Sequence, residues 1–234
     1  MRHLEDLEVH PLSGTEGASG VFFSPDGQWL GFQAGGELRK ISVSGGPALA
    51  LCDVQEMVSA SWGPDDTIIF NRSRTGGLWR VPASAGTPEQ ITVPEGEEGE
   101  DSHRLPHVLP GGHAFVFTAG QVGRFDEAKI VVLSLETGER KVLQLRGYDA
   151  RYVSTGHLVF VHEGDLLAVP FDVDRLEVVG SPALIQEGVW TDPGQSAQPT
   201  SPSLRLGPSF TNPLAETALD APWSGWIVRD GRSL

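Results

Sequence analysis

The chain has 234 residues with 29 glycines and 17 prolines, and its formal net charge at pH 7 is −14. That length suffices for one sizeable all-β domain or two small ones. The acidic balance argues against nucleic acid or an anionic membrane surface as the main partner, and no stretch approaches the roughly 18 apolar residues of a membrane span. We therefore expect no nucleic-acid binding and no direct membrane insertion of this chain.

Four segments repeat one pattern along the chain: an apolar run, a tight turn and a second apolar run. The first is 23–32 (FSPDGQWLGF), and the others are 62–70, 109–117 and 153–160. Proline presets φ near −65° at the second turn position, and Asp or Gly accepts the next position. Each segment is therefore expected to form two antiparallel strands. The spacing of the repeats suits one four-stranded unit of roughly 40–50 residues.

A third apolar run follows each repeat, at 37–43, 77–81, 129–133 and 165–169, and a turn signal then leads into a further short run. No window shows sustained helical spacing without a Gly or Pro, so little or no helix is expected. The pattern predicts an all-β fold, a β-propeller of four-stranded antiparallel blades. The predicted blades cover 18–54, 58–94, 100–145 and 148–189.

The two ends of the chain fit the repeats less well. We assign 1–189 to the propeller, with a partial outer strand of an earlier blade at 4–16. The segment 190–220 is rich in Pro, Ser, Gln and Thr and is predicted to be an irregular linker. A final partial-blade strand is expected within 221–234. Two interpretations stay open here, a five-bladed ring closed by both ends and an incomplete ring.

The repeats resemble the TolB-like and WD-like propellers of bacteria, whose repeats carry an F-S-P-D-G core. The likeness is strongest to the C-terminal propeller regions of bacterial serine/threonine protein kinases. It runs over 4–189, through FFSPDGQWLGF, GGLWRVPASAGTP and LLAVPFDVDRLEVVG. The resemblance implies a non-catalytic module that senses or binds a protein, a peptide or a small ligand on a propeller face. It also implies a kinase domain in a longer parent protein.

Compartment depends on that parent. The resemblance implies a periplasmic or extracytoplasmic location if the chain is part of a membrane-anchored kinase, and a cytoplasmic one if it is expressed as written. The kinase motifs themselves, a glycine-rich loop, a strand lysine, H-R-D and D-F-G, are absent from the sequence. We expect no enzyme activity from this chain. The alternatives are an accessory or catalytic propeller domain of a hydrolase or peptidase, and a truncated fragment without independent function.

A cluster of polar residues precedes and enters the third predicted blade: Asp101, His103, Arg104 and His107. Because loops before first strands form one propeller face, these residues are the candidate ligand-binding set. Their spacing matches no metal motif, so no metal, cofactor or catalytic residue is predicted. The alternative is a structural role, in which His103 and Arg104 satisfy loop carbonyls.

Two other features have ordinary explanations. The acidic stretch 95–101 is expected to be a solvated loop, with attraction of a cation or a basic partner as the alternative. Cys52 lies in the apolar run PALALC and is expected to be a core residue rather than a reactive thiol. As the single cysteine, it excludes an intramolecular disulfide.

Overall fold

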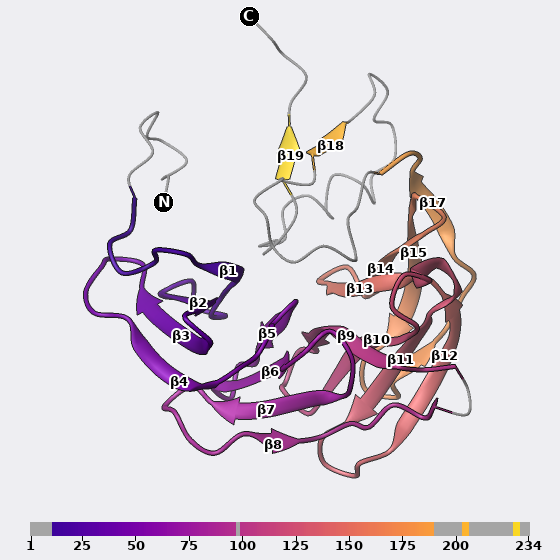
Figure 1. Ribbon diagram of the computed structural model, residues 1–234. Helices are drawn as coiled ribbons and strands as arrows, with labels where there is room; N and C mark the ends of the chain where they lie inside the picture. Colours follow the sequence, from indigo (N-terminus) through magenta and orange to yellow (C-terminus); the bar gives the residue numbers. More distant parts are fainter. Residues whose placement is uncertain (1–10, 97–98, 190–202, 206–226, 230–234) are drawn as a thin grey trace, which may run out of the picture.

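The computed structural model describes residues 11–96 and 99–189, together with the backbone of 203–205 and 227–229. Figure 1 shows four antiparallel sheets that follow one another in an arc, with the innermost strands toward its centre. The predicted all-β propeller fold of four-stranded antiparallel blades is confirmed, and the described residues form four blades. Among the described elements the helical segment is one 3₁₀ turn, η2 (Phe125–Glu127). The described part of the chain has no apolar helix of the length that a bilayer crossing requires.

The first two blades are regular four-stranded meanders in chain order. The first consists of β1 (Ser19–Phe23), β2 (Trp29–Ala34), β3 (Glu37–Ser42) and β4 (Leu49–Asp53). The second consists of β5 (Ala60–Trp62), β6 (Thr67–Asn71), β7 (Leu78–Pro82) and β8 (Glu89–Gln90). In both blades the first strand in the sequence lies nearest the centre of the arc, and each later strand lies farther out.

The third blade repeats that order, with β9 (Ser102–Val108), β10 (Ala114–Gly120), β11 (Lys129–Ser134) and β12 (Arg140–Arg146). The fourth has β13 (Tyr148–Val153), β14 (His157–His162) and β15 (Asp165–Asp172), followed by β16 (Glu177–Val178) and β17 (Ala183–Gln186). Both β16 and β17 pair with the outer edge of β15.

The fourth blade therefore differs from the predicted four strands, since its outer strand is divided in two. β15 has eight residues, and its end pairs with β16 while its beginning pairs with β17. The intervening Gly180 and Pro182 explain the break, because glycine weakens a strand and proline cannot donate to the ladder.

The core lies between the blades rather than inside any one of them. Phe115 and Phe117 of β10 belong to the same buried cluster as Ile69 of the second blade. Val116, between them in sequence, belongs instead to a cluster with Phe160 of the fourth blade. Side chains alternate between the two faces of a strand, so a strand between two other blades is apolar on both faces.

Tryptophans contribute to the same kind of packing between the first two blades. Trp62 is buried in a cluster with Phe22 and Phe70, and Trp29 and Trp79 pack partly buried against it. The rings of Phe22 and Trp62 are 6.2 Å apart. Aromatic side chains bury a large apolar area, which stabilises the contact between blades.

Three of the four innermost strands, β1, β9 and β13, contain a β-bulge where they pair with the next strand. The bulges contain residues with left-handed backbone: Gly20 at φ 59°, Leu105 at φ 53° and Asp149 at φ 54°. A bulge adds one residue to a strand and redirects the side chains that follow it. Each bulge lies just before the last residues of its strand.

Most of the predicted linker at 190–220 and of the final strand at 221–234 lies outside the described residues. β18 (Ser203–Arg205) and β19 (Ile227–Arg229) pair as parallel strands. Of the outer strand predicted at 4–16, residues 11–16 are described and contain turns. Gly14 and Gly17 take positive φ values of 91° and 70°, which turn the chain.

Candidate functional site

Close to the end of each innermost strand lie two residues that directly precede a tight turn, which we call the pre-turn pair. β13 extends one residue beyond its pair, to Val153. Backbone pairing places them at matching positions, because the last residue of each pair lies opposite the start of the second strand. The four pre-turn pairs are Phe22–Phe23, Ser61–Trp62, His107–Val108 and Arg151–Tyr152. Each blade thus places a different pair of side chains at the same position along its innermost strand.

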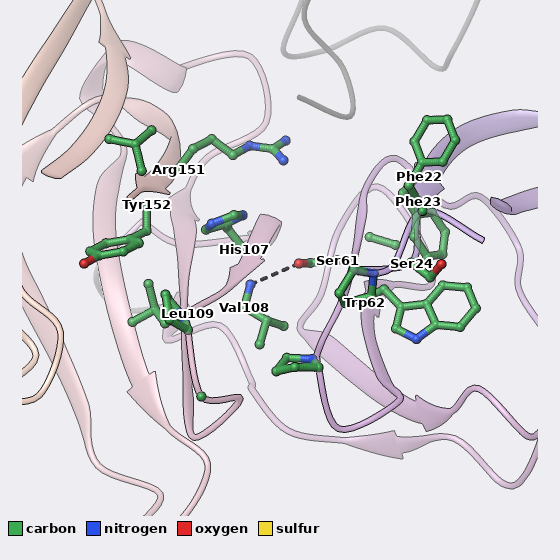
Figure 2. Close-up of a pocket in the computed structure, with 17 residues that line it drawn as sticks. Phe22, Phe23, Ser24, Ser61, Trp62, His107, Val108, Leu109, Arg151 and Tyr152 are labelled. Atoms are coloured by element: carbon green, nitrogen blue, oxygen red, sulfur yellow. Dashed lines mark hydrogen bonds between the residues drawn. The ribbon is translucent and has the colours of Figure 1, made fainter. Parts of the chain in front are cut away.

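All four pre-turn pairs line one cavity of about 650 Å³. The turns that follow them add three prolines from successive repeats, Pro25, Pro64 and Pro110. Figure 2 shows the Arg151 and His107 side chains on one side of the cavity and the aromatic residues of the first two blades on the other. Among the described residues, no Asp or Glu lines this cavity, although the chain contains 31 of them.

The wall from the first two blades is apolar. Phe23 is 44% exposed and presents its ring to the cavity, whereas Phe22 is buried. Phe22 fits because its partner on β2 is Gly31, where an added Cβ would lie 2.2 Å from the Phe22 ring. The Trp62 indole N–H donates to Asp66 Oδ1 at 3.2 Å, which holds the ring in place.

The opposite wall holds a histidine and an arginine, His107 and Arg151. Arg151 Nε donates to Asp149 Oδ1 at 2.8 Å, and the two side chains form an ion pair. Burial and the positive charge of Arg151 lower the pKa of His107 to about 3, although a hydrogen bond with the Tyr152 backbone opposes the shift. His107 is therefore neutral at pH 7, and Arg151 is the cation of the cavity.

Of the four residues predicted to bind a ligand, His107 is the one that lines the cavity. The structure places the other three elsewhere. Asp101 accepts a hydrogen bond from the Val122 backbone N–H at 2.9 Å. Arg104 is 2% exposed, its Nη2 donates to the Arg74 carbonyl at 2.6 Å, and its guanidinium lies 4.8 Å from the Phe125 ring.

His103 is 1% exposed and joins two other buried side chains. Its Nδ1 is 2.8 Å from Thr92 Oγ1, and its Nε2 is 3.1 Å from Glu100 Oε2. Thr92 Oγ1 also accepts from the Leu78 N–H at 2.7 Å, so the threonine proton is free to donate to Nδ1. The neutral Nε2–H tautomer then donates to Glu100. His103 and Arg104 thus make contacts inside the protein. Arg104 donates to a carbonyl, as the structural alternative expected, whereas His103 contacts side chains.

The acidic stretch is only partly the solvated loop that we expected. The Glu100 side chain is 1% exposed and contacts Arg140 Nη2 at 2.8 Å and Lys129 Nζ at 3.7 Å. Burial raises the pKa of Glu100, but the hydrogen bond from His103 and the charge of Arg140 outweigh burial and lower it overall. Glu100 can be buried rather than solvated because its positively charged partners offset the cost of removing a carboxylate from water.

Sequence reasoning missed the other cavity residues, in particular Arg151, Ser61 and Tyr152. Each looks ordinary by itself, and they come from repeats that are far apart in the chain. The signal was available in the repeats, since all of them occupy the pre-turn pair. In the part of the chain that the structure describes, no group of three or more His, Cys, Asp or Glu side chains could hold a metal ion.

No protein-family model matches the chain, and no curated protein matches it in sequence. Solved structures do match. An auxiliary nutrient binding protein from Bacteroides thetaiotaomicron is 13% identical over 75% of this chain and 43% of its own, with a TM-score of 0.54. TolB from Acinetobacter baumannii is 17% identical over 72% and 44%, with a TM-score of 0.52.

The Dos1 propeller matches over 74% of this chain and 48% of its own, with 11% identity and a TM-score of 0.51. The chain thus spans less than half the length of each of these three structures. At such low identity the matches establish the fold, which is that of a TolB-like β-propeller, and function is a separate question.

Proposed function

We propose that this chain is a non-catalytic propeller module that binds a protein, a peptide or a small ligand in the cavity formed by the pre-turn pairs. The observation that carries the proposal is the convergence of all four pairs on one cavity of about 650 Å³. Binding sites are typically concave and mostly apolar, with a few polar groups that fix orientation. Here Phe23 and the prolines of the turns supply the apolar surface, and Ser61, His107 and Arg151 supply the polar groups.

The finer proposal is that the module is the sensor region of a bacterial serine/threonine kinase. It rests on the resemblance over residues 4–189 to the propellers that follow such kinase domains. In that arrangement the kinase domain belongs to a longer parent, and occupancy of the cavity is the signal. Sequencing the gene upstream tests this parentage, because an in-frame kinase domain supports the proposal and an unrelated upstream gene contradicts it.

The contacts of Thr92, His103 and Glu100 favour binding over catalysis. A hydroxyl, an imidazole and a carboxylate in this order resemble the arrangement of a hydrolase triad. A nucleophile must reach its substrate, however, and Thr92 is 7% exposed and already accepts the Leu78 N–H. None of the three residues lines the cavity of the pre-turn pairs. We therefore assign them a structural role.

The binding proposal is tested by titration with N-phenyl-1-naphthylamine, a neutral apolar dye whose fluorescence rises on burial. Phe23→Glu places a charge in the cavity wall and should weaken dye binding at least fivefold. Val21→Glu is the matched control, because Val21 lies on the same strand with 46% exposure but outside the cavity. It should bind the dye as the unchanged chain does. Equal binding by both variants would place the dye elsewhere and contradict the proposal.

A further inference from the structure

The charges around the cavity differ from those of the chain as a whole. The formal net charge is −14, yet the described residues that line the cavity include one arginine and no carboxylate. His107 contributes no charge at neutral pH, because burial and the nearby Arg151 lower its pKa to about 3. The cavity is therefore a place where an otherwise acidic protein presents a cation beside apolar side chains.

Arg151 is held in a position to bind an anion. Asp149 occupies its Nε at 2.8 Å, and the side chain is 16% exposed. Among the described residues, the terminal nitrogens Nη1 and Nη2 have no further hydrogen-bond acceptor. Figure 2 shows the guanidinium directed into the cavity, across from the aromatic wall of the first blade. The two terminal nitrogens of a guanidinium fit the two oxygens of a carboxylate.

We infer that the ligand is a monocarboxylate with an apolar, aromatic-sized body, bound through its carboxylate at Arg151 and through its body at Phe23 and the neighbouring turn prolines. A single negative charge fits better than a phosphate dianion, because Asp149 already offsets part of the one cationic charge. Free organic acids and the C-terminus of a peptide share this chemistry. The inference rests on the proposed function, since it assigns a ligand class to the same cavity.

Isothermal titration calorimetry with 3-phenylpropionate and its uncharged analogue 3-phenylpropanamide tests the ligand class. The carboxylate should bind at least tenfold more tightly than the amide, because a hydrogen-bonded charge pair is lost with the amide. Arg151→Gln should remove this difference, and Arg151→Lys should restore part of it. Arg80→Gln is the control for charge, since Arg80 is an exposed residue paired with Glu89. It should keep the difference.

Asp149→Asn tests the inference in the opposite direction and covers the case in which Arg151→Gln fails to fold. Asparagine accepts the same Nε hydrogen bond and tolerates the left-handed backbone at φ 54°. Removing the carboxylate leaves Arg151 uncompensated, so 3-phenylpropionate should bind at least threefold more tightly. Unchanged or weaker binding would contradict the assigned role of Arg151.

The peptide Ala-Ala-Phe, with a free or an amidated C-terminus, separates the two sources of the carboxylate. Preference for the free peptide over 3-phenylpropionate supports a peptide terminus, and exclusion of the peptide supports a small acid. Equal binding of carboxylates and amides would overturn the inference and leave the cavity as a neutral site. Failure of the neutral dye as well would instead overturn the proposed function.

Discussion

The hydroxyl of Ser61 accepts a hydrogen bond from the backbone N–H of Val108 at 3.0 Å, and so joins the second blade to the third at the cavity wall. Ser59 makes the same kind of contact with the Leu105 N–H at 2.8 Å. The strands that they join, β5 and β9, belong to different sheets. Serine side chains thus take the place of a backbone ladder between two innermost strands.

Ser61→Ala should lower the free energy of unfolding by about 1–2 kcal/mol, because the Val108 N–H loses its acceptor in a partly buried place. Urea denaturation followed by tryptophan fluorescence measures this change. Ser84→Ala is a suitable control, because Ser84 is exposed and lies outside the contact between the blades. Equal midpoints for the two variants would show that the hydroxyl does not stabilise the junction.

His107 should remain uncharged between pH 8 and pH 5, because burial and Arg151 lower its pKa to about 3. The chemical shift of its ring Cε1–H, followed by NMR, reports the pKa directly. A midpoint near 6.5, the ordinary value for histidine, would contradict the described environment.

The same shift predicts how His107 affects stability. The unfolded chain protonates this histidine below about pH 6.5, whereas the folded chain does not until about pH 3. Its contribution is therefore present in full above pH 6.5 and is lost as the pH falls toward 3. His107→Asn should make the free energy of unfolding less dependent on pH over this interval, as urea denaturation at several pH values would measure.

Glu100→Gln should lower the free energy of unfolding by about 3 kcal/mol at pH 7, because it leaves Arg140 without its buried counter-charge. The lowered pKa of Glu100 means that this stabilisation is present above the ordinary glutamate value of 4.5 and disappears as the pH falls through the lowered value. The difference between the variant and the unchanged chain should therefore shrink in acid. Glu139→Gln, which changes an exposed glutamate, should have little effect at either pH.

Gly77→Ala should destabilise the second blade by more than about 2 kcal/mol, because overpacking against rigid backbone costs that much. An added Cβ would lie 1.7 Å from the Thr92 carbonyl oxygen, so Thr92 would have to leave its contacts with Leu78 and His103. At Gly86 the added Cβ meets the Pro82 ring at an ordinary 3.4 Å. Gly86→Ala should therefore be neutral, and a similar loss in both variants would contradict the close approach.

The fold could be predicted from the sequence because its turns recur with the same chemistry. Pro25, Pro64 and Pro110 follow three innermost strands, and apolar residues fill both faces of strands such as β10. The divided outer strand of the fourth blade could not be predicted, because it depends on the length of β15, which is long enough to pair with two short strands. The burial of Glu100 depends on Arg140, a residue of a different strand.

The site was harder to predict, because no local pattern marks it. His107 was identified for its polar side chain, and its neighbours His103 and Arg104 are also polar but lie buried inside the protein. Which of them reaches the cavity depends on the bulge at Leu105, which redirects the side chains that follow. Arg151 follows a similar bulge in the next repeat, where the sequence has no histidine to attract notice.

The central claim, that the four pre-turn pairs form a binding site, is tested most directly by NMR with indole as a neutral aromatic probe. Amide shifts of the ¹⁵N-labelled chain are followed as indole is added. The account predicts saturable shifts that cluster at Ser61, His107 and Arg151 with their pre-turn partners. Saturable shifts confined to another part of the molecule, or no shift at millimolar indole, would contradict it.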